Sequence, residues 1–531
     1  MFSAGRRGLG RRFVLLGSVL TAAALAGSAL ARTGSRPVIT EGGTLHVNVT
    51  GTDFASLDPA INYDTDGAQL LYATCAKLVN YPDRKAPAGS LLEPELSDGM
   101  PTVSADGRTY TFRISHGFRF SNGAPVGAAD FVYTIRRDLD PRMHSPVVPF
   151  LRDLVAFAAN GNTLTLKLRQ PAPDLLPRLA MTFFCVVPAG TPIVARGIDT
   201  IPSAGPYYVE SRTRGLSVTL KRNPYYSGPR PSHVDEIDFR VFQNGDSSVH
   251  QIATGAADYD IHGVPPELRR QIALRYGVNG SRFFAHPWGE TTSIVLNTSR
   301  PLFRVTSVRR AVAYALDRVA LVHALGFLPG RLTEQILPPA VPGFQRARIY
   351  PVHADVRTAK RLMGNRRGTA VLYASDNPAD APVVVVISRD LARIGINIDV
   401  RGFRTADYDR RIHRRAEPFD IALSGFTADY LDPYDFINVQ LSGHNIPAVG
   451  NQNLSHFDDP TFNRRMDAAA ALTGSRRYAA YAKLDADLMR RAVPIVPFAN
   501  EYRVEFVSSR LGCVVLAPGV GGLDFAAACL K

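Results

Sequence analysis

Short apolar runs alternate with amphipathic stretches along the last third of the chain. The run Phe419–Ser424 predicts a strand, and the run Ile396–Val400 predicts a second one. Between them, the segment Thr405–His413 has the apolar spacing of a helix. Strands that alternate with helices in this way are typical of a parallel α/β sheet.

The same pattern extends to the rest of the chain. Alternating or continuous apolar residues predict further strands over 44–49, 110–114, 164–168 and 370–373. Helical spacing predicts helices over Val356–Met363 and Val383–Ile394. The clearest helix should begin after Ser307, which can cap it, and end at Gly326. Its apolar positions are Val308, Ala311, Val312, Ala315, Leu316 and Val319.

One acidic residue stands where such a sheet would bind a ligand. Ligands of parallel α/β sheets lie beyond the carboxyl ends of the strands, and Asp429 follows the strand Phe419–Ser424. Tyr430 and Tyr434 add aromatic surface beside it. A carboxylate there can hold a cation such as a free α-ammonium through charge-assisted hydrogen bonds. The alternatives are that Asp429 caps a helix or pairs with one of the many Arg residues.

Composition indicates a large folded protein. The chain has 531 residues, of which 45% are hydrophobic, enough for two or more domains. Its formal charge is +14, carried mainly by Arg. The Arg residues are scattered, without a basic tract interleaved with aromatics beyond residues 6–12, so a generally basic surface is favoured over nucleic-acid binding. Attraction to an anionic membrane surface is a further alternative.

Residues 1–31 have the pattern of a secretory signal peptide. Four Arg precede the apolar or small stretch Phe13–Leu30, and Ala29–Ala31 forms an A-x-A cleavage signal. Leu25–Ser28 resembles a lipoprotein cleavage box in which Ser28 replaces the Cys that would carry the lipid. We therefore expect an exported protein, periplasmic or extracellular and associated with the cell envelope, that is not a lipoprotein. No other apolar run is long enough to span a membrane.

Four cysteines suit an oxidising compartment and allow three pairings: Cys75, Cys185, Cys513 and Cys529. The pair Cys513–Cys529 is favoured because it closes a short loop near the end of the chain, and Cys75–Cys185 would then follow. Buried free thiols are the alternative. No pair has the spacing of a zinc site.

Several segments, taken in order, carry a family resemblance. They are Leu57-Asp58-Pro59, the stretch Asp106–Phe112, the turn Phe118–Gly123, the loop Ser203–Tyr207 and the segment Asn223–Tyr226. Together they resemble the large solute-binding proteins of bacterial ABC importers, family 5, in the peptide- and nickel-binding group. The resemblance covers nearly the whole mature chain. Departures are Ala204 in the usual Gly-Thr-Gly-Pro-Tyr loop, and Tyr226 where Trp is usual.

The resemblance implies an α/β, two-lobed periplasmic-binding-protein-like fold of class II, large cluster C type. Its first lobe would be discontinuous, and two strands would form the hinge, crossing near Ala285–Trp288 and Pro497–Glu501. The implied divisions are a flexible linker over 32–43, a first lobe over 44–286 with an inserted subdomain at about 61–195, a second lobe over 287–498, and a return to the first lobe over 499–531.

The resemblance also implies a site between the lobes, which would close about the hinge. In peptide-binding members, an Asp at the position of Asp429 holds the ligand α-ammonium, and a neighbouring Gly and Trp line the site. Gly425 matches the Gly, whereas Phe426 replaces the Trp. Trp288, the only Trp, could stack on a ligand or belong to the core. With Tyr430, these are the expected ligand-binding residues.

The implied ligand is a peptide or other small solute. The implied partners are the permease and ATPase subunits of the importer, with no nucleic acid, and we expect a monomer without catalysis, cofactor or metal. One alternative is a non-peptide solute such as a nickel chelate or an oligosaccharide, although the histidines form no i,i+4 pair for direct metal ligation. The other is a secreted hydrolase, for which Gly-x-Ser-x-Gly, His-Glu-x-x-His and Ser-x-x-Lys motifs are missing, although a triad can assemble from distant residues.

Overall fold

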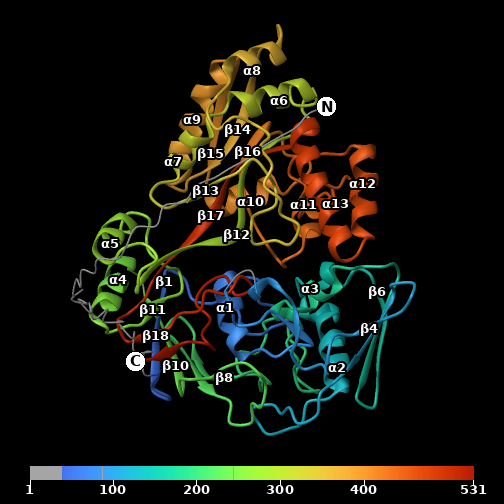
Figure 1. Cartoon of the computed structure of the whole chain (residues 1–531), viewed down its shortest axis with the longest axis vertical. Helices are drawn as coiled ribbons and strands as arrows, with labels where there is room; N and C mark the ends of the chain where they lie inside the picture. The colour runs from blue at the N-terminus through green and yellow to red at the C-terminus, as the bar shows by residue number, and fades with distance from the viewer. Residues whose placement is uncertain (1–38, 86–87, 243) are drawn as a thin grey trace, which may run out of the picture. The chain divides into compact units, whose positions relative to one another are not determined.

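The computed structural model describes residues 39–85, 88–242 and 244–531 (Figure 1). The expected signal peptide, residues 1–31, lies outside the described residues, and so does residue range 32–38 of the expected linker. The described end of that linker is hydrogen-bonded to the folded part of the chain. The backbone N–H of Thr40 donates to the carbonyl of Leu530 at 3.0 Å, and that of Gly42 donates to the carbonyl of His233 at 2.7 Å.

A five-stranded sheet forms the core of the first lobe, in the order β11-β1-β10-β9-β8. β1 lies parallel to both of its neighbours, and the remaining pairs are antiparallel. The predicted alternation is confirmed in β1, where Leu45, Val47 and Val49 are buried. The strands are β1 (Thr44–Thr50), β8 (Tyr207–Thr213), β9 (Ser217–Arg222), β10 (Glu236–Phe242) and β11 (Tyr259–Asp260).

Between β1 and β8 the chain builds a smaller subdomain around a four-stranded antiparallel sheet, in the order β4-β5-β7-β6. Its inner face buries Phe112, Leu164 and Leu166, as their alternation predicts. The strands of this part are β2 (Val79–Asn80), β3 (Glu93–Pro94), β4 (Thr102–Val103), β5 (Thr109–Arg113), β6 (Leu154–Asn160) and β7 (Thr163–Leu168). Its α-helices are α1 (Thr65–Thr74), α2 (Ala128–Asp138) and α3 (Leu175–Leu179).

The second lobe is built on a six-stranded sheet, in the order β13-β17-β12-β16-β14-β15. The parallel sheet predicted from the sequence is only half correct. β14 is parallel to β15 and β16, but β12 is antiparallel to β16 and β17, because the connecting strands enter from the first lobe. The strands are β12 (Phe283–Leu296), β13 (Gly330–Leu332), β14 (Gly368–Ser375), β15 (Ile396–Phe403), β16 (Ile421–Thr427) and β17 (Ile495–Phe506).

Helices cover this sheet and extend the second lobe (Figure 1). They are α6 (Thr306–Ala315), α7 (Arg318–Ala324), α8 (Val356–Met363), α9 (Asp380–Ala392), α10 (Thr405–Ile412), α11 (Pro433–Leu441), α12 (Pro460–Ala470) and α13 (Gly474–Asp487). The predicted single helix after Ser307 is wrong in two respects. Ser307 lies inside α6, and the chain breaks at Leu316, where Asp317 caps a second helix by accepting from the N–H of Ala320 at 2.9 Å.

β12 and β17 belong to both lobes. Their outer halves, with Phe283 and Phe506, pack against α4 (Gly245–Thr254) and α5 (Arg269–Tyr276), whereas their inner halves lie in the second-lobe core. The register of the pair shifts between Pro287 and Thr291. After β17 the chain returns to the first lobe, where β18 (Leu511–Cys513) pairs with β19 (Cys529–Leu530). The first lobe is therefore discontinuous, and two strands connect it to the second.

Candidate ligand-binding site

The loop that follows β16 is shaped by the carboxylates around it. The N–H of Asp429 donates to Oδ2 of Asp435 at 2.8 Å, and Asp435 lies fully buried in the first turn of α11. Asp432 caps the same helix by accepting from the N–H of Tyr434 at 2.8 Å, and it forms a buried ion pair with Arg477 at 2.6 Å. The backbone is thereby fixed, and the side chain of Asp429 is left to face the other lobe.

Across the cleft, the phenol of Tyr63 donates to Oδ1 of Asp429 at 2.7 Å. Burial raises the pKa of Asp429 to about 6, and the hydrogen bond from Tyr63 opposes part of that shift. Burial also raises the pKa of Asp435 well above its ordinary value, with the charge of Asp429 as the next cause. The charge of Asp429 can attract a cation, and the buried carboxyl group of Asp435 lies directly behind it.

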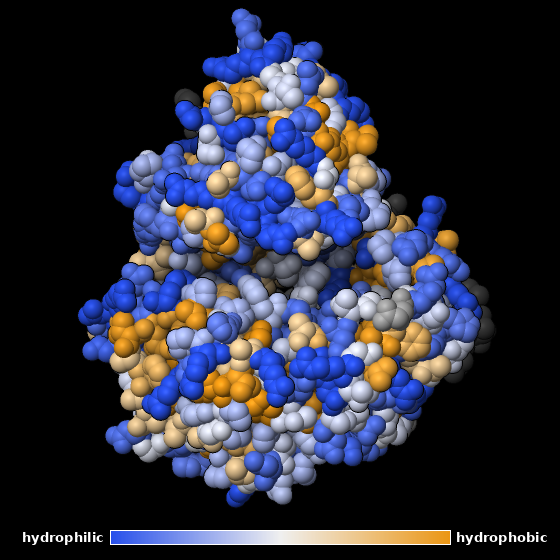
Figure 2. Space-filling model, turned by 180° about the vertical axis from the view of Figure 1, so that it is seen from behind, coloured by the Kyte–Doolittle hydropathy of each residue, from blue (hydrophilic) through white to orange (hydrophobic). Residues whose placement is uncertain are grey.

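Asp429 opens into a cavity of about 350 Å³ whose walls come from both lobes. One wall is formed by the loop after β16, with Asp429 and Tyr430, and by the middle of β12, with Trp288. The opposite wall holds Tyr63, Phe183 and the loop Pro518–Gly521. A space-filling view from behind shows the surface hollowed between the upper and lower halves of the molecule (Figure 2). Three expected site residues, Asp429, Tyr430 and Trp288, therefore lie together.

Tyr430 adds a direct link between the lobes. Its buried phenol donates to Oδ2 of Asp174 at 3.0 Å, and its ring meets Phe150 edge to face at 6.2 Å. Asp174 immediately precedes α3 in the inserted subdomain. Tyr430 thus contributes a wall of the cavity and holds that wall against the first lobe.

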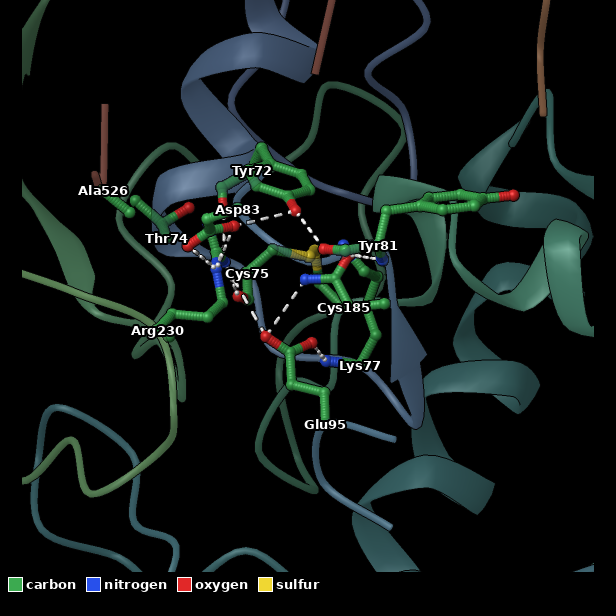
Figure 3. Close-up of polar contacts among 12 residues, drawn as sticks. Tyr72, Thr74, Cys75, Lys77, Tyr81, Asp83, Glu95, Cys185, Arg230 and Ala526 are labelled. Atoms are coloured by element: carbon green, nitrogen blue, oxygen red, sulfur yellow. Dashed lines mark hydrogen bonds and ion pairs between the residues drawn. A yellow bond between two sulfur atoms is a disulfide. The ribbon is translucent and has the colours of Figure 1, made fainter. Parts of the chain in front are cut away.

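The first-lobe wall rests on a buried ionic cluster (Figure 3). Arg230 pairs with Asp83 at 3.2 Å and lies 4.1 Å from the ring centre of Tyr72, which lines the cavity. The phenol of Tyr72 donates to the carbonyl of Tyr81 at 2.6 Å. Lys77 lies 4.7 Å from the same ring centre, and burial lowers its pKa to about 8. Further carboxylates, Glu95 at 3.7 Å and Asp524 at 3.9 Å, complete the surroundings of Arg230.

Both disulfides support the same wall. The structure joins Cys75 to Cys185 and Cys513 to Cys529, the pairing that the sequence analysis favours. The first bond links the end of α1 to the segment just after Phe183. The second closes the loop that contains Pro518–Gly521. Each disulfide thus holds a segment that lines the cavity.

Gly425 and Phe426 are not brought into this cavity. They line a second cavity of about 470 Å³ that lies over the carboxyl ends of β14 and β16, beside α9 and α10. The ring of Phe426 packs edge to face on Phe436 at 5.1 Å. A Cβ at Gly425 would meet the carboxylate of Glu290, so a side chain there would require that carboxylate to move.

Two carboxyl groups from the connecting strands face this second cavity. Glu290 on β12 accepts from the hydroxyl of Thr427 at 3.1 Å, and Glu501 on β17 accepts from the hydroxyl of Thr292. Burial and the neighbouring Glu501 raise the pKa of Glu290 to about 8. Arg269 of α5 lines the same cavity from the first lobe. The expected crossing of the lobes therefore carries buried acidic groups that the sequence analysis did not single out.

Sequence reasoning missed the first-lobe wall because its parts are far apart along the chain. Tyr63 is 366 residues from its partner Asp429. The available signals were an aromatic residue just before a capped helix and the run Pro518-Gly519-Val520-Gly521 inside a possible disulfide loop. Neither pattern by itself indicates a ligand.

Among residues 39–85, 88–242 and 244–531, no group of three or more His, Cys, Asp or Glu is placed to hold a metal ion. Within the same ranges, no helix is both long and apolar enough to cross a membrane.

The chain matches the model of a known protein family and is similar to known binding proteins. A family model described as "Bacterial extracellular solute-binding proteins, family 5 Middle" matches residues 92–447. The chain is similar to the "Probable D,D-dipeptide-binding periplasmic protein DdpA" of Escherichia coli, with 22% identity over 435 residues that cover 79% of this chain and 81% of that protein. It is also similar to the oligopeptide-binding protein OppA of Bacillus subtilis, with 24% identity over 529 residues, 92% of this chain and 93% of that protein.

The fold has solved relatives as well. The structure of clavulanic acid biosynthesis oligopeptide binding protein 2 superposes with a TM-score of 0.83 at 25% identity, and the match covers 93% of this chain and 96% of that one. The two-lobed fold class expected from the sequence is confirmed by this likeness.

Proposed function

Because the chain belongs to the bacterial extracellular solute-binding proteins of family 5, we propose that it captures a peptide between its lobes and delivers it to the permease of an ABC importer. One observation carries the choice of a peptide. The carboxylate of Asp429 lies in a cavity with walls from both lobes, and only the phenol of Tyr63 among the described residues donates to it. A peptide amino terminus supplies the cation that this carboxylate lacks.

Capture would follow from the chemistry of the cavity. The α-ammonium of the peptide would bind Asp429, and its side chains would pack on Trp288 and the opposite ring of Phe183. Main-chain groups of the peptide would need hydrogen-bond partners once the lobes enclose them, because an unpaired buried polar group costs about 1–3 kcal/mol. The loops at 427–431 and 518–521 line the cavity from its two sides.

The wider role follows from the family. Oligopeptide-binding relatives support a peptide as the solute, and the importer's ATPase subunits would supply the energy for transport. We propose that residues 1–31 direct export and are then removed, which leaves a monomeric binding protein without a lipid anchor. This role requires binding without catalysis.

The test is thermal unfolding of residues 32–531 against di- to pentapeptides, sugars and nickel chelates. A ligand present at 100 times its dissociation constant stabilises the folded state by about 2.7 kcal/mol, so peptides should raise the midpoint by several degrees. Mass spectrometry of the peptides afterwards should find them intact. A shift with sugars or chelates alone would contradict the peptide assignment, and cleaved peptide would indicate a hydrolase instead.

A further inference from the structure

The charges that line the Asp429 cavity are all of one sign. Among the described residues that form its wall, the side chains charged at neutral pH are Asp64 and Asp429, and the others are aromatic, aliphatic or neutral polar. Asp64 is committed to capping α1, because its oxygens accept from the N–H of Gly67 at 2.6 Å and from the amide of Asn62 at 2.8 Å. Asp429 is therefore the group that meets a ligand.

The arginines nearest the cavity are paired with protein carboxylates, whereas the ammonium of Lys77, buried behind the ring of Tyr72, has no hydrogen-bond partner among the described residues. Arg477 is held by Asp432 at 2.6 Å, and Arg503, which lies 5.1 Å from the ring centre of Trp288, is held by Glu505 at 2.8 Å. Arg230 is paired with Asp83 behind the ring of Tyr72. An anionic group of a ligand would have to compete with these buried pairs, and separating such a pair is costly.

A second carboxyl group lies behind Asp429, and burial raises the pKa of that Asp435 carboxyl well above its ordinary value. Asp435 lies within hydrogen-bond distance of the Asp429 backbone, and its second oxygen, Oδ1, is buried without a donor among the described residues. A ligand carboxylate placed in this cavity would be desolvated beside the charge of Asp429, whereas an ammonium would be favoured by that charge.

The rest of the cavity wall suits the uncharged part of a ligand. Tyr63 and Phe183 lie 5.7 Å apart between ring centres, and Trp288 faces the same space from the other lobe. Aromatic faces attract a cation and pack on apolar groups, and the donors that this wall offers a carboxylate are neutral ones, such as the phenol of Tyr81, which has no partner among the described residues.

We propose that this cavity selects a ligand that brings one primary ammonium and an uncharged tail, and that it discriminates against a free carboxylate held within a few residues of that ammonium. This inference rests on the proposed function. Two kinds of ligand have this chemistry: peptides whose carboxyl terminus is amidated or extends beyond the cavity, and aralkyl amines without a carboxylate.

The experiment compares Ala-Phe, Ala-Phe-Ala and Ala-Phe-Ala-Ala-Ala, each as the free acid and as the carboxyl-terminal amide, by calorimetry at pH 7. For the dipeptide, the amide should bind at least about fivefold more tightly than the acid, because its uncharged end needs no counter-ion. Each added residue carries the carboxylate about 3.3 Å further out, so the difference should shrink to less than about twofold in the pentapeptide. Phenethylamine serves as the second source, and its binding would extend the ligand class to simple amines.

Two further comparisons distinguish a failure of this inference from a failure of the proposed function. N-acetyl-Ala-Phe amide should bind at least about tenfold more weakly than Ala-Phe amide, and Asp429→Asn should remove that difference. If acetylation weakens binding and amidation also weakens it, the cavity binds both termini, and the inference is overturned while peptide capture stands. If acetylation has no effect, the amino terminus does not bind Asp429, and the inference is overturned while peptide capture stands. If no peptide binds, peptide capture fails, and the inference fails with it unless phenethylamine binds. Asp467→Asn, at a carboxylate on α12 that is 58% exposed, is the matched control.

Discussion

At the scale of single residues, the central feature is a carboxylate kept partly out of water. Asp429 is fixed through its backbone by Asp435 and through its side chain by Tyr63, from opposite lobes. Its position after a strand, together with the family resemblance, predicts a ligand contact, because carboxyl ends of strands bind ligands in sheets of this type, and this contact stays a prediction. Its raised pKa could not be predicted, since it depends on burial by residues that are distant in the sequence.

The raised pKa makes a prediction about pH. Asp429 is mostly charged at pH 7 and becomes protonated as the pH falls through about 6, whereas a peptide α-ammonium stays charged over that range. Affinity for a peptide with a free amino terminus should therefore fall about tenfold between pH 7 and pH 5. Calorimetry at both values is the measurement. The N-acetylated peptide is the control and should show little change; equal affinity of the free peptide at pH 5 and pH 7 would contradict the role given to Asp429.

At the scale of elements, local periodicity predicted many strands and helices within a few residues. α8 and α10 match their predicted segments closely, β14 and β15 contain theirs, and β16 begins two residues later than its predicted strand and ends three residues later. The errors arose where long-range pairing decides the outcome. β12 is antiparallel to β16 although nothing near either strand indicates it, and the break at Leu316 depends on Asp317, which starts a new helix. The first-lobe wall is likewise assembled from separate loops.

Those loops are held by disulfides, which leads to a prediction for Cys513→Ser/Cys529→Ser. Opening a loop of this length should cost about 3 kcal/mol of stability, and the freed segment Pro518–Gly521 should lower peptide affinity about fivefold or more, because it must be ordered on binding. Thermal unfolding measures the loss of stability, and peptide titration at about 20 °C measures the loss of affinity.

The matched control for this variant is Leu372→Ala, which removes a fully buried side chain from β14 in the second lobe. This substitution should cost about 2–5 kcal/mol of stability, a loss comparable to that of the disulfide variant, while leaving the cavity intact. Full affinity in Cys513→Ser/Cys529→Ser, or an equal loss of affinity in Leu372→Ala, would show that the disulfide does not shape the site.

At the scale of the whole molecule, the two lobes meet around the Asp429 cavity. The strands β12 and β17 pass through both cores, and their register shift between Pro287 and Thr291 lies next to Trp288 in the cavity wall. A ligand that binds Asp429 and the opposite loops would favour the closed arrangement by contacting both lobes at once. Closure would therefore depend on the same carboxylate that we propose as the ammonium site.

The most direct measurement is a titration of Ala-Phe-Ala and its N-acetyl form into the wild-type chain and Asp429→Asn, followed by the emission of Trp288, the only Trp. The wild-type protein should prefer the free amino terminus by about 10- to 100-fold, the worth of a hydrogen bond to a charged group. In Asp429→Asn that preference should disappear, whereas Asp467→Asn should retain it. The same preference in the wild type and Asp429→Asn would contradict the account, because the amino terminus would then bind elsewhere.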